Sequence, residues 1–479
     1  MTNRVLEKPH ILTLPLELQQ ILIELVIQSA RDSLPPIKSV EDETPSRSSR
    51  ERQESLQVAV PGIRELIALS STCSYYRNLL APRLFGTLFL SNSESSAGSL
   101  QIIAKGSYAT QVREIRYCGF PFAKGDNIEI MLYDDESTEG SDDSDEQEER
   151  NRPERFADAV KDVLENLSRF PNLYELSVEF AFSWDDIEEI HEIVHDEALI
   201  IDQDSTSSWR RLVHSSWKSI CQNGPGLPSL RIRHYQCLHV DVFADELIPI
   251  LKDLKAFSIE FQGYDNGAGW MLNTQMAFRH TAERLGNFFE HLVECETLRF
   301  HLDDSAPIGE ASSENHMHHH VLELSDLPKL KHLDLMCIFV DEKFTKWLVA
   351  RVPLLETLQM TNCACSSEYY EWSRLFLSLR QTGLKNLKSF ELESSGLMLW
   401  DAFEEDEPDD SAEEQEQARA IAQYQAQGRR VFPYASLDDK YGMNFVDCEA
   451  NRAYYLSGQD DREFKALMKL VGSNHESGS

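Results

Sequence analysis

Leu330-Lys331-His332-Leu333-Asp334-Leu335 is one copy of a six-residue phrase that recurs through the middle of this chain. Apolar residues occupy its first, fourth and sixth positions. Beyond the fourth position apolar and polar residues alternate, so each copy predicts a short strand with one buried face. The other copies keep the same apolar positions and begin at Leu173, Leu254, Cys295, Leu355 and Leu387.

Helical patterns precede most copies of the phrase and return the chain toward the next strand. They cover residues 156–170, 276–293, 344–352 and 369–380. Residues 88–90, 112–117 and 226–237 keep only the outline of the phrase and extend the series of predicted strands toward the N-terminus.

These helix-plus-strand units resemble leucine-rich repeats. The resemblance implies a parallel sheet on the concave side of a curved solenoid, in which units stack because none can bury its own apolar face. Phrase starts lie 25 residues apart at the shortest, between Leu330 and Leu355, and much further apart elsewhere. The repeats are therefore degenerate and carry insertions. An ordinary α/β domain that contains several copies of a common leucine pattern is the alternative.

A second feature lies near the N-terminus, in the stretch LPLELQQILIEL that begins at Leu14. Three- and four-residue steps place its apolar side chains on one helix face, and proline at the second position suits a first helical turn. The helix is too short to form a core of its own, so its apolar face needs a partner. The residues of this stripe are Leu14, Pro15, Leu18, Ile21, Leu22 and Leu25.

A second short apolar helix, residues 63–69, is followed by STCSYYRNLL from Ser71. Together with the first stretch, the order LPxEL, Leu-x-x-Leu, Cys, aromatic, basic, Leu resembles an F-box, a three-helix module that binds the Skp-family adaptor of cullin-RING ubiquitin ligases. The resemblance adds four residues to the adaptor-binding set: Leu66, Leu69, Cys73 and Tyr76. An uninterrupted F-box lacks the insertion at 29–61 seen here. Helices that merely cap the domain behind them are the alternative.

The fold class that follows is α/β, with a small N-terminal three-helix F-box-like module before an irregular leucine-rich-repeat-like solenoid that carries acidic disordered insertions. The predicted divisions are the F-box-like module at 10–90 with a disordered insertion at 29–61, the solenoid at 91–400 with an acidic loop at 134–150, an acidic linker at 401–430, and a C-terminal cap at 431–473.

Composition narrows the class of partner. The formal net charge is −35, and residues 134–149 and 401–416 each hold ten acidic residues. No clustered Lys and Arg are present to bind phosphates, so a nucleic-acid partner is not expected. Nine cysteines without a pairing pattern favour a reducing compartment, and no apolar run is long enough for a membrane span. We therefore expect a cytoplasmic or nuclear protein with no membrane partner.

One string suggests catalysis: His191-Glu192-Ile193-Val194-His195 matches HExxH, which places two zinc ligands on one helix face with Glu192 as general base. No third ligand follows at a suitable spacing, and the predicted helix is rich in acidic residues. Zinc metallopeptidase activity is thus the least favoured alternative. We expect no metal, no cofactor and no enzymatic activity.

The sequence as a whole resembles F-box proteins with degenerate leucine-rich repeats. The resemblance implies the substrate-recognition subunit of a cullin-RING ubiquitin ligase, with a Skp-family adaptor, and through it cullin, bound at the F-box and a protein client at the solenoid. Such a receptor brings its client close to the ubiquitin-loaded enzyme without chemistry of its own. A repeat scaffold with no ligase role is the alternative from another class.

Overall fold

The computed structural model describes residues 70–71, 74–119, 156–180, 208–223, 226–235, 246–261, 285–286, 288–303, 322, 325–366, 368, 370–394, 399, 412–437, 442 and 444–477. All structural statements below concern these residues. The predicted helices at 14–25 and 63–69, the HExxH string and the acidic loop at 134–150 lie outside them.

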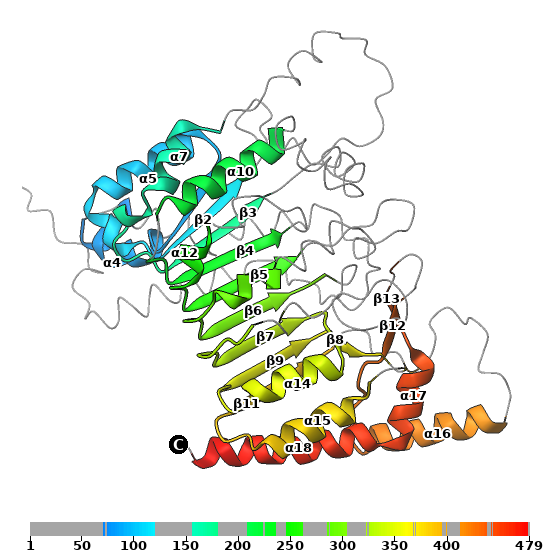
Figure 1. Ribbon diagram of the computed structural model, residues 1–479. Coiled ribbons are helices and arrows are strands. Elements are labelled where there is room, and N and C mark those ends of the chain that lie inside the picture. The colour runs from blue at the N-terminus through cyan, green and yellow to red at the C-terminus, as the bar shows by residue number, and fades with distance from the viewer. Residues whose placement is uncertain are drawn as a thin grey trace, which may run out of the picture.

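Nine parallel strands form one sheet in which every strand pairs with its predecessor and successor among the nine (Figure 1). The chain is thus a mixed α/β protein with a large parallel sheet, as predicted. In order across the sheet, the strands are β1 Thr87–Ser91, β2 Glu114–Gly119, β3 Glu175–Phe180, β4 Ser229–Tyr235, β5 Ala256–Phe261, β6 Thr297–His301, β7 His332–Met336, β9 Thr357–Thr361 and β11 Ser389–Glu393.

Each strand arises from one copy of the recurring phrase or from its outline, so the strands that the phrase predicts are confirmed. The apolar positions are the reason: in β7, Leu333 and Leu335 are at most 1 % exposed, and Leu330 just before the strand is fully buried. Burying these side chains fixes the register, because a slip of one residue would turn them to the opposite face.

The backbone repeats the same hydrogen bonds from strand to strand. The Lys255 carbonyl accepts hydrogen bonds from the N–H groups of Glu296 and Thr297, and the Glu296 carbonyl accepts them from Lys331 and His332. Equivalent pairs of bonds begin the other strand pairings from β1 to β11, except that the pairing of β3 with β4 begins with one bond because Pro228 has no N–H to donate. Successive strands therefore start level with one another, although the intervals between them in the chain are uneven.

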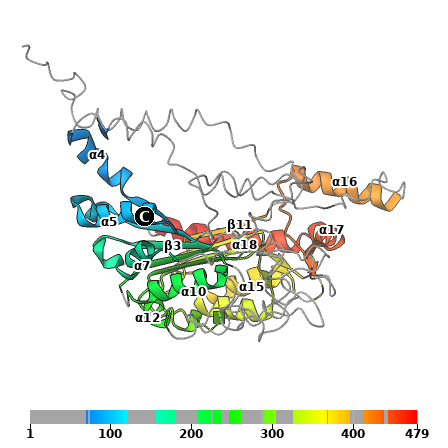
Figure 2. The same ribbon diagram turned by 90° about the horizontal axis from the view of Figure 1, so that it is seen from above.

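Helices cover one face of this sheet, and Figure 2 shows α7, α10, α12 and α15 gathered on that side. The Tyr117 hydroxyl of β2 lies 2.8 Å from the Ser216 hydroxyl of α10, so sheet and helices share one core. The helices that precede β11 are α4 Ser74–Leu84, α5 Glu94–Lys105, α7 Asp158–Glu165, α10 Ser208–Cys221, α12 Ile248–Leu251, α14 Glu342–Arg351 and α15 Trp372–Thr382, with short 3-10 helices η3 Ser107–Gln111 and η4 Leu167–Arg169.

The predicted helices at 156–170, 344–352 and 369–380 correspond to α7 with η4, to α14 and to α15. Most of the predicted helix at 276–293 lies outside the described residues. Two short strands, β8 Phe339–Val340 and β10 Ala364–Cys365, form a separate parallel pair that the phrase does not predict.

The C-terminal segment packs against the end of the sheet beyond β11. It comprises α16 Ala412–Ala426, the antiparallel strands β12 Ala435–Leu437 and β13 Asn444–Val446, and the helices α17 Cys448–Ser457 and α18 Gln459–Ser477. Helix α18 contacts both α15 and β11. Its Phe464 lies 5.3 Å from Phe376 of α15 and 6.0 Å from Phe390 of β11, measured between ring centroids.

Part of the predicted acidic linker is helical. The linker was expected over residues 401–430, and residues 412–426 form the helix α16. Ile421 of this helix is buried in a small cluster with Leu399 and Tyr455. The density of acidic residues suggested a solvated segment, whereas one buried apolar side chain on α16 joins it to the C-terminal helices.

Candidate functional site

The face of the sheet opposite the helices carries polar and charged side chains, and we call it the polar face. Successive residues of a strand point to opposite sides. In β2 the alternation is regular: Ile115 and Tyr117 are buried in the core, while Glu114 and Arg116 are partly exposed. Because the strands are level, equivalent residues of neighbouring strands lie side by side in rows.

The middle row of the polar face, which we call the central row, crosses all nine strands in unbroken register. Its residues are Phe89, Arg116, Ser177, Arg231, Ser258, Arg299, Asp334, Gln359 and Glu391. Arginine occupies every second strand from β2 to β6, with serine between. Strands lie about 4.8 Å apart, so the arginines are spaced at about 10 Å.

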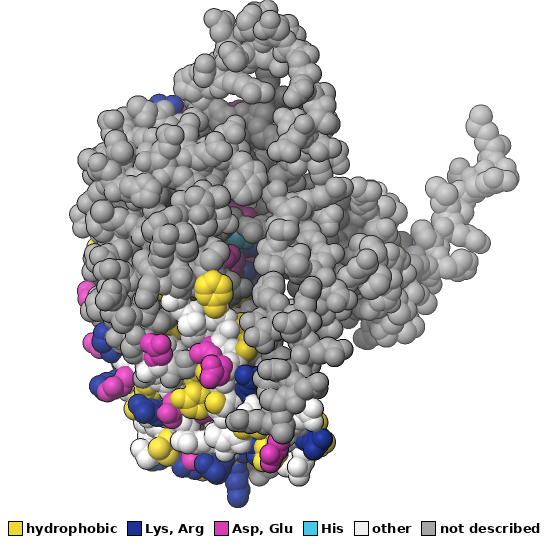
Figure 3. Space-filling view, turned by 90° about the vertical axis from the view of Figure 1, so that its right-hand side faces the viewer, with side chains coloured by type: hydrophobic (Ala, Val, Ile, Leu, Met, Phe, Trp, Pro, Cys, Tyr) yellow, Lys and Arg dark blue, Asp and Glu magenta, His cyan; other side chains and the backbone are white. Residues whose placement is uncertain are grey.

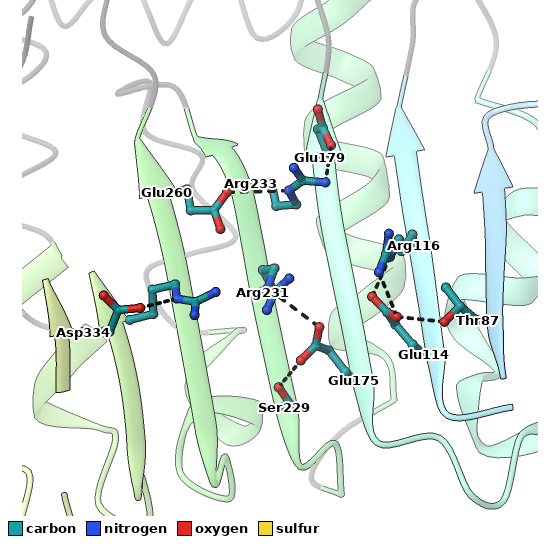
Figure 4. A network of polar contacts seen from close by, with 11 residues as sticks. Thr87, Glu114, Arg116, Glu175, Glu179, Ser229, Arg231, Arg233, Glu260 and Asp334 are labelled. Carbon is teal, nitrogen blue, oxygen red and sulfur yellow. Dashed lines mark hydrogen bonds and ion pairs between the residues drawn. The ribbon is translucent and has the colours of Figure 1, made fainter. Parts of the chain in front are cut away.

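Two of these arginines are hydrogen-bonded to carboxylates (Figure 4). Arg116 donates from Nε and Nη2 to Glu114, at 2.6 and 3.2 Å. Arg299 donates from Nε to Asp334 at 2.7 Å. These contacts hold the guanidinium groups against the sheet.

Asp334 also forms a 2.9 Å hydrogen bond with His301. Burial opposes the ionisation of this carboxyl, but the contacts with His301 and Arg299 outweigh that effect and lower the pKa of Asp334. The carboxylate therefore stays charged and remains an acceptor for both partners.

The middle of the polar face holds two further arginines on one strand, Arg231 and Arg233 of β4 (Figure 4). The Arg231 Nε atom lies 3.7 Å from Glu175, and Arg233 lies 3.6 Å from Glu179 and 3.5 Å from Glu260. Side-chain exposure is 30 % for Arg231 and 22 % for Arg233. Both are therefore partly accessible at the centre of a face whose charges alternate in sign from β3 to β7.

Among its described residues, the polar face includes the thiol of Cys118, which is un-ionised, because burial and then the Glu179 carboxylate raise the pKa of Cys118 well above its usual value. No group of three or more His, Cys, Asp or Glu side chains in the described part of the chain is placed to hold a metal ion.

Surface charge elsewhere is mixed. In the view of Figure 3, acidic and basic side chains are interspersed on the described surface. Among the helices the structure describes, none is long and apolar enough to cross a membrane.

The adaptor-binding residues predicted from the sequence lie outside the described residues, with one exception. Tyr76 is in α4 and is 3 % exposed, whereas the neighbouring Tyr75 is 42 % exposed. The two rings pack edge to face, with centroids 5.5 Å apart. The structure thus places Tyr76 inward on α4, and the role of the complete set stays a prediction. His191, Glu192 and His195 also lie outside the described residues.

Sequence analysis named no residue of the polar face, although a signal was present. The third and fifth positions of the recurring phrase are its outward-facing positions, as His332 and Asp334 show in β7. Without the strand register, those positions could not be assembled into rows.

No family model matches this chain, and no curated protein is significantly similar to it.

Proposed function

We propose that this chain is the substrate-recognition subunit of a cullin-RING ubiquitin ligase. Its N-terminal F-box-like helices bind a Skp-family adaptor, and through it cullin, while the sheet region forms a leucine-rich-repeat-like solenoid whose polar face binds a protein client. The chain itself catalyses no reaction. Its contribution is to raise the effective concentration of the client near the ubiquitin-loaded enzyme.

The observation that carries the solenoid part of the proposal is the strand order. Doubly wound α/β sheets reverse their strand order and carry helices on both faces. Here the nine strands follow chain order without reversal, and each comes from one copy or outline of the same phrase. Linear stacking of similar units is typical of solenoids, and it favours the repeat interpretation over an ordinary α/β domain.

The polar face supports a binding role for this solenoid. Stability alone does not explain the rows of arginine and carboxylate on this face, because exposed ion pairs contribute only about 0–1 kcal/mol each to the free energy of folding. Charged groups held in fixed positions do give specificity for a complementary partner. Arg231 and Arg233 of β4, at the centre of this face, are charged groups of this kind, with carboxylates 3.5–3.7 Å away.

The adaptor part of the proposal rests on the sequence from Leu14 to Leu25 and from Ile63 to Phe85. Burial of five side chains such as Leu14 and Leu18 would contribute roughly 8–15 kcal/mol before costs. Association and ordering cost roughly 4–15 kcal/mol. The difference between this gain and this cost allows sub-micromolar adaptor binding.

A pull-down with purified Skp-family adaptor tests the proposal. We expect the wild-type chain to retain the adaptor and the double variant Leu14→Asp/Leu18→Asp to lose it, because two carboxylates would have to be buried at the contact. The matched control is Gln19→Asp/Gln20→Asp, which places the same charges on the opposite face of the same helix and should bind normally.

Failure of the wild-type chain to bind the adaptor would exclude the receptor function and leave the repeat scaffold. Equal binding by both double variants would show that the stripe beginning at Leu14 is not the docking face.

A further inference from the structure

We propose that Arg231 and Arg233 bind two carboxylate side chains of an extended acidic client segment. The proposal rests on the client-binding function proposed above and specifies its chemistry. It is carried by four observations on β3, β4 and β5: unused donors, carboxylates whose hydrogen bonds go to other partners, a bulge in the strand, and a buried serine.

The first observation is that neither guanidinium of β4 forms a hydrogen bond with the described residues. Their nearest carboxylate oxygens lie at 3.5–3.7 Å, beyond the usual range of about 2.7–3.2 Å. The Nε atom of Arg231 is buried and has no hydrogen-bond partner there. Arg116 and Arg299, by contrast, are hydrogen-bonded to Glu114 and Asp334. The centre of the polar face thus has unused donors.

The second observation is that two neighbouring carboxylates already have other partners. Glu175 accepts a 2.9 Å hydrogen bond from the Ser229 hydroxyl, and Glu179 lies 2.6 Å from His234 Nδ1. These contacts are shorter than those to the arginines. The other oxygen of each carboxylate faces an arginine but lies 3.7 Å from Arg231 and 3.6 Å from Arg233, so neither guanidinium receives a hydrogen bond from these carboxylates.

The third observation is a bulge where β4 passes β5. The register shifts between Ile232 and Tyr235, so that Arg233 and His234 together face Glu260. His234 has a φ of +46°, which is uncommon for a residue other than glycine. Bulges re-aim side chains and are enriched near functional sites. Here His234, in the bulge, lies 2.6 Å from Oε1 of Glu179, while Arg233 lies 3.6 Å from Oε2 of the same carboxylate.

The fourth observation is Ser258, which lies directly beside Arg231 in the central row. Its hydroxyl is buried, and it has no hydrogen-bond partner among the described residues. Buried polar atoms are rarely left unpaired without a reason. Arg231, Arg233 and Ser258 therefore form one group of unsatisfied polar side chains.

The charge of the surrounding groups distinguishes between the two common acidic ligands, a carboxylate and a phosphate. Three carboxylates, those of Glu175, Glu179 and Glu260, lie within 4 Å of the two guanidinium groups. They would repel a phosphate dianion more strongly than a carboxylate monoanion. Arginine forms paired hydrogen bonds with either group, so the lower charge of the carboxylate is what favours it.

Spacing further defines the client segment. Residues two apart on a strand are separated by about 7 Å, which applies to Arg231 and Arg233. An extended segment has the same spacing between alternate side chains. Two acidic residues separated by a single residue therefore match the two arginines.

Fluorescence anisotropy of the full chain with a labelled peptide centred on Glu-Ala-Glu tests this inference. A Gln-Ala-Gln peptide is the matched probe, and Arg116→Gln, on an arginine already bonded to Glu114, is the matched variant. We expect Arg231→Gln and Arg233→Gln to weaken binding of the Glu peptide roughly tenfold or more. Arg116→Gln should change it less than about twofold, and the Gln peptide should bind weakly to every form.

Two results would overturn the proposal: equal binding of the Glu and Gln peptides to the wild type, or equal losses in Arg116→Gln and Arg233→Gln. Tighter binding of a matching phosphoserine peptide would assign the site to phosphate instead. Thermal unfolding of each variant distinguishes a loss of binding from a loss of structure. The variant Arg233→Lys, which keeps the charge, is included in the same comparison. The assay contains no adaptor, so its outcome is independent of the pull-down.

Discussion

Replacing Phe376 with alanine is expected to lower the free energy of unfolding by about 3–5 kcal/mol. The side chain is fully buried on α15, where it meets the sheet and the C-terminal helices together. Its ring centroid lies 5.2 Å from that of Phe432 and 5.3 Å from that of Phe464. Alanine would leave a cavity bordered by rings from three separate segments, which cannot collapse together without moving the backbone.

The matched control is Phe445→Ala in β13. This phenylalanine is 51 % exposed, so its removal should change stability by no more than about 0.5 kcal/mol. Urea titration gives both values, and hydrogen exchange should show faster opening of α18 only in Phe376→Ala. Equal effects of the two substitutions would mean that the C-terminal segment is not part of the main core.

Asp460 connects the same two parts of the molecule through polar contacts. It lies near the start of α18 and is 2 % exposed. Its carboxylate accepts a 2.9 Å hydrogen bond from the backbone N–H of Ser373 and another of 2.9 Å from the Tyr434 hydroxyl. Ser373 is in the first turn of α15, where the N-cap residue Glu371 makes no side-chain capping bond. Asp460 thus caps α15 from a distant part of the chain.

Asp460→Ala is expected to lower the free energy of unfolding by about 2–6 kcal/mol. It leaves a helix N–H group and a buried phenol without an acceptor, at about 1–3 kcal/mol each. The matched control is Asp447→Ala, which removes an ordinary cap: Asp447 accepts a hydrogen bond from Ala450 N at the start of α17, so about 1 kcal/mol should be lost. A loss for Asp460→Ala no larger than for Asp447→Ala, measured by urea titration, would exclude the bridging role.

The same residue predicts an unusual dependence of stability on pH. Burial, with a smaller contribution from the nearby Glu371, raises the pKa of Asp460 to about 6 despite its hydrogen bonds. The folded state therefore holds this proton more tightly than the unfolded chain does. The stabilisation is present below about pH 4 and is lost as the pH rises through 6.

Comparison with Asp460→Asn isolates this effect from the many other carboxylates. The stability of the wild type relative to the asparagine variant should fall by about 2 kcal/mol between pH 4.5 and 7.5. A difference between the two proteins that is constant with pH would contradict the raised pKa.

The strands were predictable because their signal is local. Leucine at the first, fourth and sixth positions, as in Leu355, Leu358 and Met360, is enough to place a buried strand. The helices α14 and α15 were equally predictable from the local sequence. The F-box resemblance was also read from local order, and of its predicted adaptor-binding residues only Tyr76 lies in the part of the chain that the structure describes.

The helix α16 was not predicted, because local composition pointed the other way. Its first five residues belong to an acidic run, whereas Ile421 and Tyr424 pack against Tyr455 of α17. These contacts join residues more than thirty positions apart in the sequence, so the local pattern of apolar residues does not predict them.

The sequence by itself determined which residues form the strands and which faces they bury, because the period-two alternation of each phrase contains that information. Only the tertiary structure decided which outward-facing residues meet. Arg231 lies beside Ser258, and Asp460 reaches Ser373, 87 residues away. Such pairings depend on the register of the stacked strands and on the packing of the C-terminal helices. Both are set by the many apolar contacts of the whole core acting together.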